Sequence, residues 1–268
     1  MSQKGNQLDQ VLARLLDRRL SRNQLRRLTI TPNDAADFSS NGYLSLSSQP
    51  AVQRAFLARL RAAALSSESL LGSGGSRLLD GNSSLAETLE RTIAAFHHAP
   101  AGLLFNSAMD ANVGLFACVP QPGDAIVYDE LIHASVHDGM RLSRAGKKVP
   151  FAHSCVKSLE AVLQSLLRGP DGSLLKSGQR NVFVVVEGVY SMDGDVAPLL
   201  DIVGCVERCL GQGNGYVIVD EAHSTGIFGE HGRGLVCELG LEERVWARVL
   251  GFGKAMGCSG GNYAIPSR

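Results

Sequence analysis

Short apolar runs alternate with longer amphipathic stretches along most of this sequence. The runs, rich in β-branched and aromatic residues, lie at residues 102–105, 125–128, 149–152, 182–186, 216–219 and 248–250. Stretches with apolar residues every three or four positions predict helices at residues 84–97, 108 onward, 133–146, 156–168 and 198–210. This order of strand and helix predicts the α/β fold class, with a mostly parallel sheet covered by helices on both faces.

The first 65 residues follow a different pattern. Residues 7–28 place leucines on one side of a predicted helix and arginines on the other, and Pro50 begins a second helix to about Leu65. We therefore divide the chain into an N-terminal helix and arm (1–48) and a large domain (49–268). The arginine-rich face is interpreted as a solvated face on its own domain, with binding of an anionic substrate as the alternative.

The composition of the chain limits the kinds of partner that it is expected to bind. The chain has 26 basic and 26 acidic residues, so no net field draws it to nucleic acid or to an anionic membrane. No N-terminal apolar run is long enough for a signal peptide or a membrane span. The six cysteines form no Cys-x-x-Cys pair and have no histidine at metal-binding spacing. We expect a cytoplasmic protein with reduced thiols, no metal site, and small molecules or other proteins as partners.

Candidate chemistry gathers where the predicted strands end. In open α/β sheets, ligands bind at the carboxyl ends of the strands. Neither a dinucleotide-binding glycine fingerprint nor a Walker A motif follows a strand. The residues at these ends are Ser107, His133, Ser191, Asp220, His223 and Lys254.

These residue types fit one cofactor. A lysine among glycines can form a Schiff base when its surroundings lower its pKa, and a buried aspartate requires a cation. Pyridoxal 5'-phosphate (PLP) provides a protonated ring nitrogen for the aspartate, and its phosphate suits the helix N-terminus after Ser107. The remaining histidines are interpreted as ordinary surface or core groups. They are His97, His98, His137, His153 and His231.

Three long motifs carry a family resemblance. They are DEAHSTGIFG at residues 220–229, GFGK at residues 251–254 and EGVYSMDGD at residues 187–195. In the order in which they occur along the chain, these motifs resemble the α-oxoamine synthase family of fold-type I PLP enzymes. The resemblance implies a PLP-binding large domain followed by a small C-terminal domain, which is absent from these 268 residues. That domain would supply the arginine for the substrate carboxylate, so we expect cofactor binding without robust turnover by this stretch alone.

The resemblance also implies roles for individual residues. Lys254 matches the lysine that holds PLP and moves the substrate α-proton, and Asp220 matches the partner of the ring nitrogen. His223 matches the donor to the ring phenolate, His133 the histidine stacked on the ring, and Ser191 a serine near the cofactor. The phosphate turn corresponds to Ser107, Ala108 and Met109. Two residues match substrate-side positions, Arg26 and Asn41.

The implied reaction is the decarboxylative condensation of an amino acid with an acyl-CoA. The resemblance favours L-alanine and pimeloyl-CoA, as in biotin biosynthesis, in a homodimer with sites at its interface. Two alternatives stay open. One is a family member of sphingoid-base or secondary-metabolite synthesis, and the other is a catalytically incomplete fragment or accessory subunit.

The sequence departs from the family pattern at three places. Gly251 stands where relatives often have a threonine that contacts the phosphate. Ala108 and Met109 replace the usual glycine and aromatic residue, and Gly42 follows Asn41 in place of an aspartate. These changes remove a hydroxyl donor and alter the substrate side of the expected site.

Overall fold

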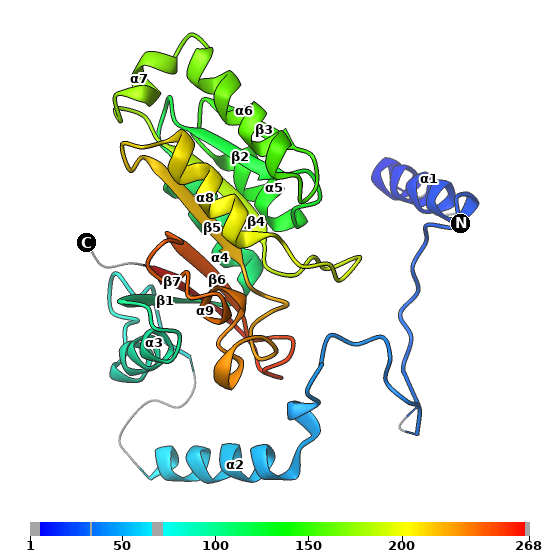
Figure 1. The fold of residues 1–268 in the computed structure, drawn as a ribbon. Helices are drawn as coiled ribbons and strands as arrows, with labels where there is room; N and C mark the ends of the chain where they lie inside the picture. The colour runs from blue at the N-terminus through cyan, green and yellow to red at the C-terminus, as the bar shows by residue number, and fades with distance from the viewer. Residues whose placement is uncertain (1–5, 33, 66–71, 266–268) are drawn as a thin grey trace. The chain divides into compact units, whose positions relative to one another are not determined.

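The computed structural model describes residues 6–32, 34–65 and 72–265 (Figure 1). Contacts divide the chain into residues 1–40 and residues 41–268, and each unit is described by itself. The functional boundary expected after residue 48 stays a prediction. None of the described helices combines the length and the apolar character that a membrane crossing requires.

The first unit contains one helix, α1 (Gln7–Ser21). The Asn6 side chain accepts a hydrogen bond from the Leu8 N–H and begins the helix. The predicted helix over residues 7–28 is too long, because Asn23 takes a left-handed backbone with φ of 54°. Asparagine tolerates this conformation, which commonly ends helices. The helix therefore ends near Asn23, although apolar residues continue at helical spacing beyond it.

The second unit holds the other elements. Its helices are α2 (Pro50–Ala64), α3 (Ser84–Phe96), α4 (Ala108–Cys118), α5 (Ala134–Leu142), α6 (Val156–Arg168), α7 (Gly172–Lys176), α8 (Leu199–Cys209) and α9 (Leu235–Glu238), with 3₁₀ turns at Leu46–Ser48 and Glu230–Gly232. Its strands are β1 (Ala101–Phe105), β2 (Ala125–Asp129), β3 (Lys147–Phe151), β4 (Val182–Glu187), β5 (Gly215–Asp220), β6 (Ala247–Gly251) and β7 (Gly261–Ile265).

Most of these elements agree with the sequence pattern, and several differ. Helix α5 ends at Leu142 instead of residue 146, because Ser143 turns to extended backbone. Helix α7 begins within the turn predicted at residues 169–172, and β7 follows the glycine-rich loop. Helices α7 and α9 and strand β7 were not predicted, since four or five residues show little periodicity.

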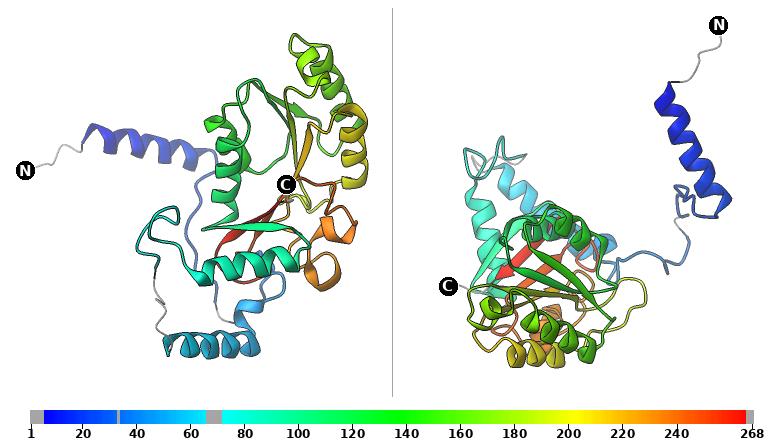
Figure 2. Two further views of the ribbon diagram at one scale, coloured as in Figure 1. Left: turned by 90° about the vertical axis from the view of Figure 1, so that its left-hand side faces the viewer. Right: turned by 90° about the horizontal axis from the view of Figure 1, so that it is seen from above.

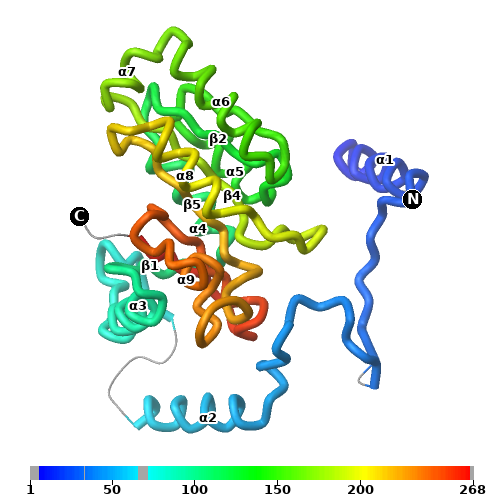
Figure 3. The backbone as a smooth tube through the Cα atoms, viewed as in Figure 1, coloured from blue at the N-terminus to red at the C-terminus, as the bar shows by residue number. Residues whose placement is uncertain are grey.

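The strands of the described residues form one seven-stranded sheet in the order β1-β7-β6-β5-β4-β2-β3. Strands β6, β5, β4, β2 and β3 run parallel, and β7 runs antiparallel to both β1 and β6. Figure 3 follows the chain from β5 through the loops around α9 into β6 and β7. The mostly parallel sheet predicted from the sequence is confirmed.

Helices cover both faces of this sheet. Side chains alternate along β4, so Val184 packs in the layer with α6, α8 and α9, and Val185 in the layer with α4 and α5. Figure 2 shows the helices on opposite sides of the strands. Every residue of β4 is buried, as the unbroken apolar run predicts for a strand covered on both faces.

Parallel strands bring their carboxyl ends to one edge of the sheet. Strands β2, β4, β5 and β6 end in Asp129, Glu187, Asp220 and Gly251. The register pairs Glu187 with Asp220, so two buried carboxyl groups lie on neighbouring strands. This edge is the place where the fold positions its candidate site.

Candidate active site

A cavity of about 580 Å³ opens at the carboxyl ends of these strands. Its volume lies in the range typical of small-molecule sites. The predicted site residues that line it are Asn41, Ser107, Ala108, Met109, His133, Asp220 and Lys254. The cavity is also lined by residues that sequence reasoning did not select, among them Asn112, Ser135 and Glu187.

Asp220 is held rigidly at the floor of the cavity. Its side chain is 5% exposed, and its Oδ2 atom accepts a hydrogen bond from Asn112 Nδ2 at 2.7 Å. The Oδ1 atom accepts from the Ala222 backbone N–H at 2.9 Å. A buried carboxylate needs such donors and a cationic partner. Asn112 comes from α4, so this helix fixes the carboxylate's orientation.

A chain of hydrogen bonds continues from Asp220 to His133. Asn112 Nδ2 also donates to Ser135 Oγ at 3.0 Å, and Ser135 Oγ lies 2.8 Å from His133 Nδ1. His133 is the N-cap of α5, and its Nδ1 accepts from the Ser135 backbone N–H at 3.2 Å. The ring proton of neutral His133 is therefore on Nε2.

Glu187 is the second carboxyl group in the cavity lining. It is 2% exposed, and its Oε1 atom has no hydrogen-bond partner among the described residues. Burial, with the nearby Asp220 as a second cause, raises the pKa of Glu187 to about 8. This carboxyl group therefore keeps its proton through most of the neutral range.

Lys254 enters the cavity from the loop after β6. Burial lowers the pKa of its ammonium group, while Asp220 and Glu187 act in the opposite direction. A lysine with a lowered pKa has a larger fraction of neutral amine, the form that attacks a carbonyl.

His223 lies beside the cavity and is not among its lining residues. It is 8% exposed, and its Nδ1 atom lies 2.6 Å from Tyr43 Oη. Burial lowers the pKa of His223 to about 4, with the charge of Lys254 as the next cause. His223 is thus neutral at physiological pH, and Tyr43 fixes the direction of its ring.

The N-terminus of α4 forms one wall of the cavity. Ser107 caps this helix, because its Oγ atom accepts from the Asp110 N–H at 3.0 Å. The other N–H groups of the first turn lack carbonyl partners within the helix, and such a turn binds anions. A Cβ atom on Gly261 would lie 2.5 Å from the Ala108 nitrogen, so the backbone of β7 packs directly against the first turn of α4.

Two predicted residues have other positions. Ser191 is exposed in the turn after β4 and does not line the cavity, although its backbone N–H acts on the Glu187 carboxyl group. Arg26 belongs to residues 1–40, where it lies in the segment that follows α1. The functional roles of all ten predicted residues stay predictions.

The missed residues have different sequence signals. Glu187 ends the most continuous apolar strand, and a carboxylate in that position signals a functional edge. Asn112 and Ser135 follow the N-termini of α4 and α5 by a few residues. Polar residues are common there, so they carry no distinguishing pattern.

Comparison with known proteins identifies similar chains. 8-Amino-7-oxononanoate synthase from Emericella nidulans is 59% identical over 88% of this chain and 56% of its own length. Aminoacyl transferase sphA from Aspergillus fumigatus is 43% identical over 85% of this chain and 47% of its own length. A solved lysine-to-alanine variant of serine palmitoyltransferase from S. paucimobilis, with a bound PLP–myriocin aldimine, has a TM-score of 0.78. It is 26% identical, and the match covers 98% of this chain and 64% of that one.

The chain spans about half the length of the curated relatives it matches. Residues 33–268 match the model of the family described as aminotransferase class I and II. This match confirms the fold-type I large domain and the resemblance to α-oxoamine synthases inferred from the motifs. The chain therefore belongs to the aminotransferase class I and II family, whose members are PLP-dependent.

Proposed function

We propose that this chain binds PLP through Lys254 and carries the cofactor site of an α-oxoamine synthase. The observation that carries the proposal is the shared cavity of Lys254, the buried Asp220 and the N-terminus of α4. An amine, a carboxylate and an anion-binding helix end match the aldehyde, ring nitrogen and phosphate of PLP. The unpartnered Oε1 atom of buried Glu187 further supports a polar ligand in this cavity.

Bound PLP supplies an electron sink that stabilises negative charge on the α-carbon of an amino acid. The chain's own residues hold and move protons around that carbon. Asp220, fixed by Asn112, stabilises a proton on the ring nitrogen. Lys254 accepts the α-proton as a neutral amine, which its lowered pKa favours. His133 offers its Nε2 proton for contact with the ring or the substrate.

The proposed reaction joins the deprotonated amino acid to an acyl-CoA, releasing the thiol and then carbon dioxide. We propose L-alanine and pimeloyl-CoA as substrates, as in biotin biosynthesis. The 59% identity to the 8-amino-7-oxononanoate synthase of Emericella nidulans supports this choice. The second candidate pair is another amino acid with a longer acyl-CoA, supported by the similarity to sphA and to serine palmitoyltransferase.

Borohydride reduction tests cofactor binding directly. The full 268-residue chain is incubated with PLP, reduced, digested and mapped by mass spectrometry. We expect the pyridoxyl adduct on Lys254, its loss in Lys254→Ala, and its retention in the exposed control Lys148→Ala. An unmodified Lys254 in the folded wild-type chain would refute the proposal.

Substrate identity has a separate test. Carbon dioxide release is measured with alanine or serine, each paired with pimeloyl-CoA or palmitoyl-CoA. Wherever carbon dioxide release is detected, even at a low rate, we expect the most from alanine with pimeloyl-CoA, and preference for serine with palmitoyl-CoA would select the second candidate. A reducible adduct without carbon dioxide release from any pair would indicate a cofactor-binding fragment or accessory subunit.

We also propose a cytoplasmic homodimer. Helix α2 supports a partner, because Phe56 and Leu57 on it are 66% and 46% exposed. The six free cysteines support a reducing compartment. We expect light scattering of the purified chain to give twice the monomer mass. A monomer mass at micromolar concentration would contradict the dimer.

A further inference from the structure

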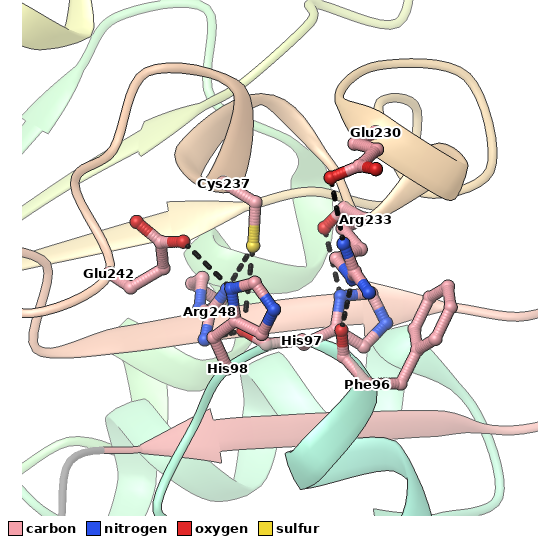
Figure 4. Close-up of polar contacts among 8 residues, drawn as sticks. All are labelled: Phe96, His97, His98, Glu230, Arg233, Cys237, Glu242 and Arg248. Atoms are coloured by element: carbon pink, nitrogen blue, oxygen red, sulfur yellow. Dashed lines mark hydrogen bonds and ion pairs between the residues drawn. The ribbon is translucent and has the colours of Figure 1, made fainter.

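A group of three metal-ligating side chains lies outside the cavity. It consists of His98 just after α3, Cys237 in α9 and Glu242 in the loop before β6, and we call it the His98 cluster (Figure 4). His98 and Glu242 are 144 residues apart in the chain. None of the three lines the cavity at the strand ends. The cluster therefore has a chemistry separate from the proposed PLP site.

The ligand atoms of the cluster are already close to metal-binding geometry. His98 Nδ1 lies 3.2 Å from Glu242 Oε1, and the ligand atoms of all three residues lie within 4.8 Å of one another. Around tetrahedral Zn²⁺, nitrogen and oxygen ligands lie about 3.3 Å apart, and sulfur and nitrogen about 3.6 Å apart. Side-chain shifts of about 1 Å at most would complete this arrangement.

The donor set selects the metal. An imidazole, a thiolate and a carboxylate together suit Zn²⁺, whereas Mg²⁺ and Ca²⁺ prefer oxygen ligands alone. The His98 side chain is 53% exposed and that of Glu242 is 18% exposed. Zinc can therefore enter from solvent, and one coordination position is left for water. Three protein ligands and a water are typical of open zinc sites.

A buried outer layer holds Cys237 in position. Arg248 is 2% exposed, and its Nη1 atom donates to Cys237 Sγ at 3.1 Å. Its Nη2 atom donates to the His97 carbonyl oxygen at 2.7 Å, and the Cys237 thiol contacts the same carbonyl at 3.4 Å. Burial raises the pKa of the Cys237 thiol and the Arg248 charge acts in the opposite direction, so the thiol proton leaves when the metal binds. Such outer contacts orient the ligands of metal sites.

The backbone also presents His98 toward the cluster. His98 has a left-handed backbone with φ of 52°, which turns the chain at the end of α3. A non-glycine residue in this conformation costs energy and is retained where the surrounding structure requires it. The turn directs the imidazole to Glu242 instead of continuing the helix (Figure 4).

We propose that His98, Cys237 and Glu242 bind one Zn²⁺ ion, with water in the remaining position. Binding displaces the Cys237 thiol proton to solvent. The ion links the end of α3 to the segment between α9 and β6, and β6 leads into the loop that carries Lys254. Zinc at about a hundred times its dissociation constant is expected to raise the unfolding temperature by about 5 °C or more.

Zinc titration of the chelator-treated 268-residue chain tests the site with matched variants. We expect His98→Asn, Cys237→Ser and Glu242→Gln each to weaken binding about a hundredfold. The controls are His231→Asn, Cys118→Ser and Glu243→Gln. His231 is a close match because its φ is also left-handed, at 58°, and asparagine tolerates that backbone. Equal zinc affinity in the cluster variants and in their controls would overturn the proposal.

X-ray absorption spectroscopy of the zinc-loaded wild-type chain keeps the test independent of variant folding. One sulfur neighbour at about 2.3 Å and two or three nitrogen or oxygen neighbours at about 2.0–2.2 Å are expected. A zinc shell without sulfur, or with two or more sulfur atoms, would overturn the assignment. Failure of the wild-type chain to bind zinc would do the same.

Discussion

Replacing Glu187 by glutamine should change how the stability of the cofactor-free chain depends on pH. The glutamine has nearly the same shape and cannot ionise. Glu187 is 2% exposed, and burial raises its pKa from 4.5 to about 8. Between these values the unfolded chain has released the proton while the folded chain keeps it. Stability therefore falls as pH rises through this window, because the unfolded state binds fewer protons.

The size of the effect follows from the two pKa values. Each tenfold difference in proton affinity corresponds to about 1.4 kcal/mol, so the full effect approaches about 5 kcal/mol above pH 8. Between about pH 5.5 and about pH 8.5, the wild-type chain should lose about 3 kcal/mol through this one group. The Glu187→Gln variant should not show this pH-dependent loss of stability, because glutamine does not ionise.

Urea unfolding at several pH values measures the difference between wild type and variant. Groups that do not interact with Glu187 cancel between the two chains, so the free-energy difference reports Glu187 together with the two groups coupled to it, Asp220 and Lys254. We expect the variant to gain about 3 kcal/mol relative to wild type across this range. Exposed Glu243→Gln, the matched control, should show a difference independent of pH.

Two outcomes would refute the reasoning. A wild-type to Glu187→Gln difference that stays constant with pH would show that burial does not raise this pKa. A difference that shrinks as pH rises would show that Glu187 is stabilised in its charged form. Either result would show that the Glu187 carboxyl group is not kept protonated in the cavity near neutral pH.

Three further changes test the framework of the site. Asn112→Ala should cost about 1.5–3 kcal/mol of stability and weaken PLP binding, because Asp220 loses a charge-assisted hydrogen-bond donor. Urea unfolding measures the loss of stability, and PLP titration measures the loss of affinity. Ser107→Ala should lower helix stability by about 1 kcal/mol in thermal unfolding through loss of the α4 cap. Gly261→Ala should cost about 1–3 kcal/mol, because its Cβ would meet the α4 backbone, whereas Gly211→Ala, which faces open space, should be nearly neutral.

The sequence was most informative where periodicity is strong. The all-apolar run at residues 182–186 and the helix at residues 156–168 are confirmed with nearly the predicted bounds. Short or interrupted elements escaped prediction, since a five-residue strand such as β7 is defined by its pairing with β1 and β6. Asn23 shows the reverse case, in which one residue's backbone preference ended a helix that the leucine pattern extended.

The site was predictable as a set of strand-end residues, but its internal contacts were not. Asp220 and Lys254 follow apolar runs, and parallel strands bring such ends to one edge. The link from His133 through Ser135 to Asn112 depends on how α4 packs against α5. The His98 cluster is the extreme case, because His98 and Glu242 are 144 residues apart in the chain and only the fold brings His98 to Cys237 and Glu242.

The cavity lining offers different partners to the cofactor phosphate and to the carboxylate of the substrate. Near neutral pH, Glu187 keeps its proton and His223 is neutral, because their pKa values are about 8 and about 4. Of the described residues that line the cavity, Lys254 is the sole lysine or arginine. A phosphate can use the N–H groups of α4 instead of a cation. The carboxylate of an amino acid has no such helix end to itself, and none of the other described lining residues offers it a lysine or arginine. PLP binding and turnover should therefore fail independently, which is why the borohydride and carbon dioxide assays answer different questions.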